Sequence, residues 1–219
     1  MKLILLIATL FIPVVQGKDV DDVLVSCRFL GFEPAKDGTT SLVAPGKDGK
    51  PETIALTMGE TLSKPVVLKS EQGMITFRKG ESDTAAAATA KIPAGTKDAI
   101  ILFIPTEKEG LILETLVVDS SAKAFPPGNS IVVNHCPQKA KITMGEHVID
   151  IKPDESVAVA RPKEIDEFNM VNVKSELETD GTWRIASESN IRFVQTQRNL
   201  FVMHIDAETK RPRFWFFQE

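Results

Sequence analysis

The chain has 219 residues, of which 42% are apolar, with 26 Lys and Arg against 30 Asp and Glu. This apolar fraction is ordinary for a globular protein and excludes an intrinsically disordered chain, while two cysteines are too few for a disulfide-rich miniprotein. The net charge of −4 supplies no basic surface for nucleic acid or for an anionic membrane, so neither is an expected partner.

The first 17 residues have the order of a secretory signal peptide. Lys2 is followed by an apolar run over residues 3–15 and then by Gln16 and Gly17. The run is too short for a transmembrane helix, which needs about 20 apolar residues, and no later run approaches that length. We therefore expect residues 1–17 to be removed and the mature chain to be periplasmic or secreted.

Cys27 and Cys136 are the two cysteines of the chain. In an oxidising compartment an even, small number of cysteines favours a disulfide, so the sequence predicts that these two are bridged. The alternative is a pair of separate buried thiols that pack as small hydrophobic side chains.

The apolar residues of the mature chain recur in short runs that are bounded by Gly, Pro, Asp and Lys. This pattern predicts an all-β fold, an antiparallel β-sandwich. Residues 99–104 are apolar on both faces of a strand, which predicts a central strand covered on both sides. Residues 82–90 are compatible with a short capped helix or with an extended crossing segment. The expected strands are 23–32, 53–58, 66–69, 74–78, 99–104, 111–118, 130–134, 140–144, 147–151, 156–160, 169–173, 182–187, 200–205 and 213–217.

A repeated tetrapeptide bears on the number of domains. Thr-Met-Gly-Glu occurs at 57–60 and again at 143–146, each time near the end of an expected strand. The repeat suggests two packed β units, an N-terminal β region over 18–95 and a C-terminal β-sandwich region over 96–219. A single domain over 18–219 is the alternative.

One stretch resembles a known pattern. Phe125-Pro126-Pro127-Gly128 is followed by Asn134, by Gly145 and by the run Lys152-Pro153-Asp154-Glu155-Ser156. This order resembles a pattern in uncharacterised secreted β-rich proteins of environmental bacteria and covers about thirty residues here. The resemblance implies a β-sandwich and carries no activity with it.

Local catalytic signatures are missing from the sequence. It has no nucleophile elbow, no zinc-protease motif, no phosphate-binding glycine loop, no Cys-x-x-Cys and no EF-hand loop. The densest set of metal-ligand types is His135, Cys136, Met144 and His147. Because neighbours in a strand point to opposite faces, His135 and Cys136 would not converge on one ion, so we expect neither a metal nor a cofactor.

Trp183 and Trp215 are the candidate binding residues. Secreted β-sandwiches can present Trp side chains as flat surfaces for sugar rings, but residues 213–217 are apolar on both faces, which favours a core position for Trp215.

These observations predict a non-catalytic extracytoplasmic β-sandwich protein that makes a structural or binding contact in the cell envelope, with an envelope protein or a glycan as partner. The alternative is a secreted hydrolase that cleaves glycans through a carboxylate pair, which leaves no local motif.

Overall fold

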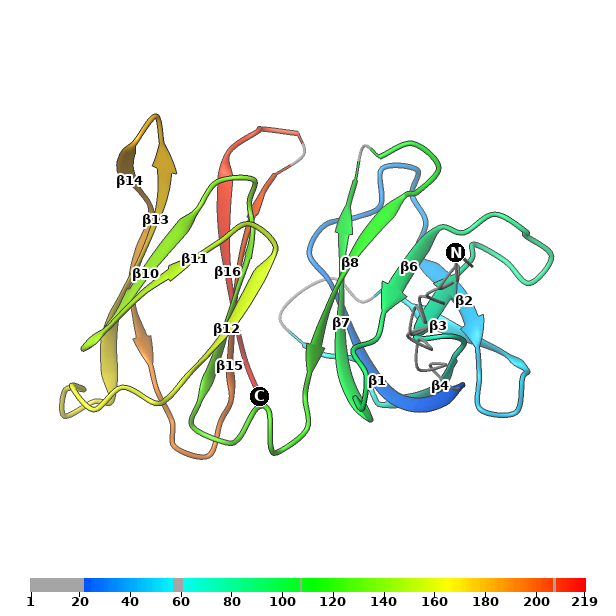
Figure 1. The fold of residues 1–219 in the computed structure, drawn as a ribbon, viewed down its shortest axis with the longest axis horizontal. Coiled ribbons are helices and arrows are strands. Elements are labelled where there is room, and N and C mark those ends of the chain that lie inside the picture. Colours follow the sequence, from blue (N-terminus) through cyan, green and yellow to red (C-terminus); the bar gives the residue numbers. More distant parts are fainter. Residues whose placement is uncertain (1–21, 57–60, 107, 207) are drawn as a thin grey trace, which may run out of the picture.

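The computed structural model describes residues 22–56, 61–106, 108–206 and 208–219. Every regular element in these residues is a strand, so they contain no helix that could cross a membrane (Figure 1). The strands are β1 (Val23–Gly31), β2 (Ser41–Pro45), β3 (Pro51–Ala55), β4 (Val66–Ser70), β5 (Met74–Phe77), β6 (Ala88–Lys91), β7 (Asp98–Pro105), β8 (Leu113–Asp119), β9 (Ser130–His135), β10 (Ala140–Met144), β11 (His147–Ile151), β12 (Glu155–Val159), β13 (Met170–Thr179), β14 (Thr182–Arg192), β15 (Asn199–Ile205) and β16 (Pro212–Gln218).

The first eight strands form a β-sandwich. One layer is a four-stranded sheet in the order β4-β1-β7-β8, in which β1 and β7 run parallel and the other neighbours run antiparallel. The second layer consists of the hairpins β2–β3 and β5–β6, which are joined by two backbone hydrogen bonds between Val43 and Arg78. An antiparallel sandwich is thus the fold of this unit, with one parallel strand pair at its centre.

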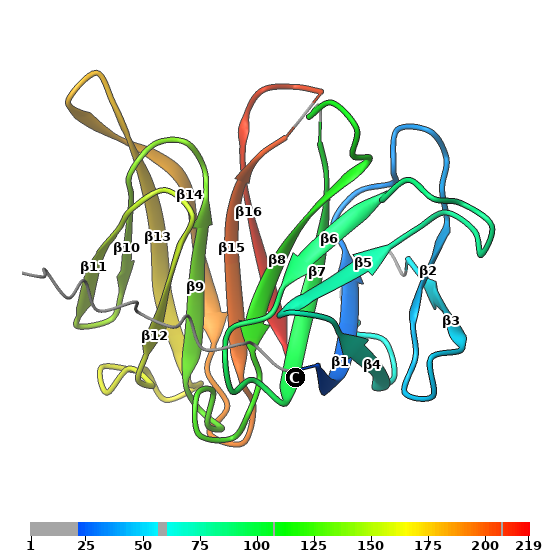
Figure 2. The same cartoon turned by 45° about the vertical axis from the view of Figure 1, so that its right-hand side comes forward.

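The last eight strands repeat this topology. Their inner sheet has the order β12-β9-β15-β16, again with a parallel pair, β9 and β15, at the centre. Their outer sheet has the order β11-β10-β13-β14 and is built from the hairpins β10–β11 and β13–β14 (Figure 2). Each strand of the first unit therefore has a counterpart eight strands later.

The strand pairing places the division between the units after Asp119 and before Ser130. The boundary expected at 95/96 falls between β6 and β7, and β7 and β8 belong to the sheet that contains β1. The expected boundary therefore has to be corrected, because pairing over long sequence distances, which a local pattern does not display, decides which strands form one unit.

The repeated tetrapeptide does not mark the structural repeat. Residues 143–146 form the turn between β10 and β11, whose counterpart in the first unit is the β2–β3 turn at residues 46–50. Residues 57–60 follow β3 in the sequence and lie outside the described residues. In the order of the chain, the first copy thus follows β3, whereas the second copy contains the end of β10.

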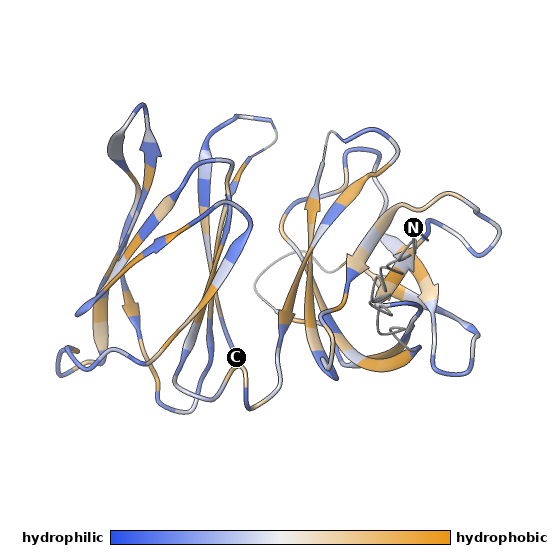
Figure 3. Ribbon diagram, in the orientation of Figure 1, coloured by the Kyte–Doolittle hydropathy of each residue, from blue (hydrophilic) through white to orange (hydrophobic). Residues whose placement is uncertain are grey.

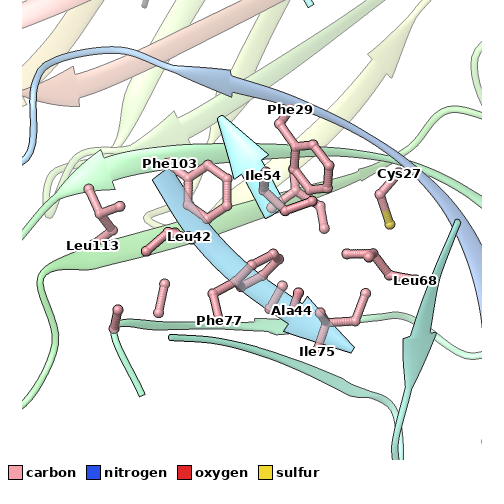
Figure 4. Close-up of a cluster of buried hydrophobic side chains, with 14 of the residues drawn as sticks. Cys27, Phe29, Leu42, Ala44, Ile54, Leu68, Ile75, Phe77, Phe103 and Leu113 are labelled. Carbon is pink, nitrogen blue, oxygen red and sulfur yellow. The ribbon is translucent and has the colours of Figure 1, made fainter. Parts of the chain in front are cut away.

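Three apolar cores hold the layers together. The first lies between the inner sheet and the hairpins of the first unit, where Phe29, Phe77 and Phe103 meet in the centre (Figure 4). The second lies between the two sheets of the second unit and includes Phe193 and Phe201. The third joins the two units and contains buried residues from both inner sheets.

The third core makes the two inner sheets pack face to face, so the protein has four β layers. Strand β7 supplies Ile101 to the first core and Ile100 and Leu102 to the third, which confirms the expected strand covered on both sides. Apolar colour follows the strands of both inner sheets, whereas the connections at their ends are mostly hydrophilic (Figure 3). Burial on both faces explains why these strands read as continuous apolar runs.

The predicted disulfide is wrong in this structure. Both cysteines are free and buried, Cys27 in the first core and Cys136 in the second. The third core lies between these two places, so the side chains are separated by two packed sheets and cannot meet the distance that a disulfide requires. Burial raises the pKa of each thiol to about 12, so both remain protonated at neutral pH.

Candidate functional site

A cleft of about 960 Å³ opens at one end of the interface between the units, next to the β15–β16 hairpin at the top of Figure 1. The first unit contributes residues 32–36, which follow β1, and Pro105 at the end of β7. The second unit contributes residues of the β15–β16 hairpin and Trp215 of β16. The site is thus composite, because neither unit forms it alone.

Aromatic rings from both units form the apolar wall of the cleft. The ring centroid of Phe32 lies 5.7 Å from that of Trp215 and 5.6 Å from that of Phe217. Phe217 is buried in the third core, whereas Trp215 is only partly buried there and also lines the cleft. This arrangement holds the Trp215 ring by contacts on the core side and leaves part of it accessible.

A hydrogen bond fixes the orientation of this indole. The Nε1–H of Trp215 donates to Nε2 of His204 over 2.7 Å, and His204 is buried. Burial lowers the pKa of His204, which favours the neutral ring, and only a neutral ring can accept at Nε2. The histidine therefore serves to position the tryptophan.

Two carboxyl groups meet in the cleft, Glu33 from the first unit and Asp206 from the second. Thr209 donates to Oδ1 of Asp206 from its backbone N–H over 2.6 Å and from its hydroxyl over 2.8 Å. These bonds, with the Arg213 guanidinium beside the carboxylate, hold the pKa of Asp206 far below its usual range. Burial, the charge of Asp206 and a hydrogen bond with it raise the pKa of Glu33. The pair therefore consists of a fixed carboxylate and a carboxyl group that protonates more readily.

Cationic side chains surround the two acids. Lys36 comes from the first unit, and Lys210 and Arg213 come from the hairpin. Arg213 donates from Nε to Oδ2 of Asp206 over 3.2 Å, while about half of its side chain is exposed. The cleft therefore combines an aromatic wall with a rim of hydrogen-bond donors and acceptors of both charges.

The repeat places a second, related position between the end of β9 and the β7–β8 hairpin, where His135 is the neighbour of His204 in the parallel pair of β9 and β15. There the ring of His135 lies between two carboxylates, with Nε2 2.9 Å from Glu114 and Nδ1 2.9 Å from Asp154. Lys108 also pairs with Glu114. Side chains thus fill this position with ion pairs, whereas its counterpart at Glu33 and Trp215 is open.

The two candidate tryptophans do not form one site. Trp215 lines the cleft, whereas Trp183 lies on β14 in the outer sheet, on the side of the second unit away from the first. Nζ of Lys141 lies 3.9 Å from the centroid of the Trp183 ring. The ring of Trp183 therefore already has a cationic side chain over it.

The metal-ligand types near residue 140 have different surroundings. His135 contacts acids at the interface, Cys136 and Met144 are buried in the second core, and Nε2 of His147 lies 3.5 Å from Glu146. No group of three or more His, Cys, Asp or Glu side chains in the described residues is arranged to hold a metal ion. These four residues are close in the sequence, but their side chains do not converge on one point in the structure.

The resembling stretch has structural roles in the second unit. The side-chain amide of the buried Asn134 donates to the carbonyls of Gln138, Ile151 and Lys152, and its Oδ1 accepts from the N–H of Cys136. Gly128 and Gly145 both have positive φ angles. These positions hold turns together and contact no residue of the cleft wall.

Sequence reasoning missed Glu33, Asp206 and Arg213. Asp206 and Arg213 flank the last hairpin, and Glu33 follows the first strand, so 173 positions separate the two acids. Comparison with protein-family models and with curated proteins finds no match for the chain. The chemistry of the site therefore has to be inferred from its own residues.

Proposed function

We propose that the protein is a non-catalytic, extracytoplasmic binding protein that holds a glycan in the cleft between its two units. The observation that carries this proposal is the partly accessible Trp215 ring beside Phe32, surrounded by Glu33, Asp206 and Arg213. Ligand sites of this size usually combine an apolar wall with a few polar groups that fix orientation.

The chemistry of a sugar ring suits this wall and rim. A pyranose has an apolar C–H face that packs on an aromatic ring, and its hydroxyls donate to carboxylates and accept from Lys and Arg. Because Asp206 is already bonded to Thr209 and Arg213, Glu33 is the carboxyl group best placed to bind a ligand hydroxyl. Side chains occupy the related position at His135, whereas the cleft at Glu33 and Trp215 is open, and this contrast also favours ligand binding in the cleft.

The alternative function, glycan hydrolysis, has weaker support. Hydrolases of this type separate their two carboxyl groups by about 5–5.5 Å or by about 6.5–9.5 Å, so that a glycosidic bond fits between them. Glu33 and Asp206 are instead close enough to share a hydrogen bond, and Asp206 is held by four further donors. The geometry therefore favours binding.

Export remains part of the proposal. It rests on the charged and apolar order of residues 1–17, which lie outside the described residues. Two buried thiols in separate cores are compatible with an oxidising compartment, since neither can reach the other.

The test uses Trp215 as the reporter. In W183F it is the only tryptophan, so a change in fluorescence on adding neutral and acidic oligosaccharides reports on the cleft. We expect E33Q in this background to weaken binding about tenfold, because hydrogen bonds to charged groups contribute about 1.5–3 kcal/mol. E188Q, which changes an exposed acid on the outer sheet, should bind like its parent.

Two results would overturn the proposal. One is that no oligosaccharide changes the fluorescence, or that E33Q and E188Q bind equally. The other is the release of reducing ends from the oligosaccharides, abolished by E33Q, which would favour the hydrolase.

A further inference from the structure

A second cavity lies at the opposite end of the interface, near the C-terminal end of the chain in Figure 1. It measures about 430 Å³, which lies within the range of about 300–1,000 Å³ for small-molecule sites. Like the cleft it takes its lining from both units, and β7 and β16 contribute to both sites, but the two sites share no lining residue.

The walls of this cavity are largely apolar. They come from both inner sheets and from the connections beside them, and comprise Leu62, Ile100, Phe125, Leu200 and Phe217. Ser63 fixes the connection that carries Leu62, because its Oγ accepts from the N–H of Phe29 and its own N–H donates to the Phe29 carbonyl, each over 2.9 Å. The outer wall is thus attached to β1.

The polar end of the cavity holds two arginines that contact the same glutamate side chain. Arg28 of the first unit forms a two-point contact with the Glu219 side chain, and Arg198 of the second unit pairs with the same carboxylate. Arg198 also donates to the carbonyls of Ser120 and Phe125. Two guanidinium groups thus share one side-chain carboxylate.

These charges are reachable from solvent. The side chains of Arg28, Arg198 and Glu219 are 23%, 20% and 20% exposed. Glu219 lies just beyond the end of β16, so its side chain can turn away without breaking a strand pair. A second carboxylate could then accept the same fork of guanidinium donors, which matches carboxylate geometry.

We propose that this cavity binds an alkyl carboxylate, with the carboxylate on Arg28 and Arg198 and the alkyl chain along Leu62, Ile100 and Leu200. An apolar wall needs an apolar occupant, and two guanidinium groups that already hold a carboxylate at its mouth select a carboxylate head group. This binding is independent of the proposed glycan site.

The test is calorimetric titration of the full chain with decanoate below its micellar concentration, with decan-1-ol as the neutral analogue. R28M removes one cation and keeps an apolar stem, so decanoate affinity should fall about tenfold while decanol affinity stays unchanged. E219Q removes the competing carboxylate and should strengthen decanoate binding severalfold. R184M, which removes an exposed cation from β14, is the matched control and should bind like the native chain.

R28M should weaken decanoate binding and E219Q should strengthen it, so one of the two variants still tests the proposal if the other folds poorly. The proposal would be overturned if R28M and E219Q left the affinity for decanoate unchanged, or if decan-1-ol bound as tightly as decanoate. A lack of binding at millimolar decanoate would also overturn it. Adding saturating decanoate to the glycan titration separates the two sites, because each ligand should bind regardless of the other.

Discussion

Trp215 belongs to two environments, because its ring packs on the third core while it lines the cleft. The sequence favoured a core position on the ground that residues 213–217 are apolar on both faces. The structure shows both faces of β16 covered, with Phe214 and Phe216 on the second core and Phe217 on the third. Phe214, Trp215 and Phe216 are nevertheless only partly buried, and β16 is the edge strand of its sheet.

We expect W215A to lower the free energy of unfolding by about 3 kcal/mol, since it removes a large packed ring and leaves His204 without its donor. W215F keeps a ring and should lose about 1–2 kcal/mol. W183A should lose about 1 kcal/mol or less, because the Trp183 ring lies on the outer sheet and is paired with the partly exposed Lys141. Urea unfolding followed by circular dichroism measures all three, and equal losses for W215A and W183A would contradict this assignment.

Other residues show what a local pattern cannot reveal. Cysteine number and compartment favoured a bridge between Cys27 and Cys136, but the decisive fact is that they point into different cores. Glu33 and Asp206 gave no signal, because each follows an ordinary strand and their meeting depends on how the two units pack. Residue types predict what chemistry is available, while the third core determines which groups meet.

At the scale of elements, the bounds of β10 and β11 are those that the sequence predicted, and both strands alternate in burial. Strands β7 and β16, which have apolar residues on both faces, are each one residue longer at both ends than expected. Strand β2 was not predicted, although its five residues alternate between half-buried and buried positions. The expected strand 169–173 covers only the first half of β13, because the second half alternates buried and half-exposed residues that include Lys174, Glu176 and Glu178. The uncertain stretch 82–90 contains no helix and leads into β6.

The connections contain a matched pair of glycines. Gly128, in the link between the units, and Gly110, in the β7–β8 hairpin, both have a φ of +83°. A Cβ added at Gly128 would lie 3.0 Å from the backbone carbonyl oxygen of Gln195, whereas one at Gly110 would have nothing within 4 Å.

We therefore expect G110A to cost about 1–2 kcal/mol, the usual penalty of a left-handed backbone for a residue with a Cβ. G128A should cost more, about 2–4 kcal/mol, because the link must also move away from the β14–β15 connection. Thermal unfolding of the two variants measures the difference. Equal melting temperatures would show that the link adapts freely and does not fix the position of β9.

At the scale of the whole molecule, two units with the same topology meet through inner sheets that are apolar on both faces. Each unit places its first strand against the last strand of the other, as the contacts of Arg28 with Glu219 and of His135 with Glu114 show. The sequence predicted the fold class but not the packing of the two inner sheets on each other. An apolar run shows that a strand is buried on both faces, but it does not show which sheet covers each face. Separating the units would expose the third core to water, so we expect them to unfold together.

This coupling can be measured in a W215F background, where the remaining tryptophan, Trp183, lies on the outer sheet of the second unit, so that fluorescence reports on that unit. F77A removes a buried ring from the core of the first unit and should cost about 3–5 kcal/mol. If the third core couples the units, the urea midpoint measured by fluorescence must fall as far as the midpoint measured by circular dichroism. V171A, which truncates a side chain in the second core, is the control and should shift both signals together. The contrary result is that F77A leaves the fluorescence midpoint unchanged while circular dichroism shows an earlier unfolding step. That result would mean that the units unfold as independent domains. The third core would then hold the two units, and the cleft and cavity between them, more weakly than its buried residues indicate.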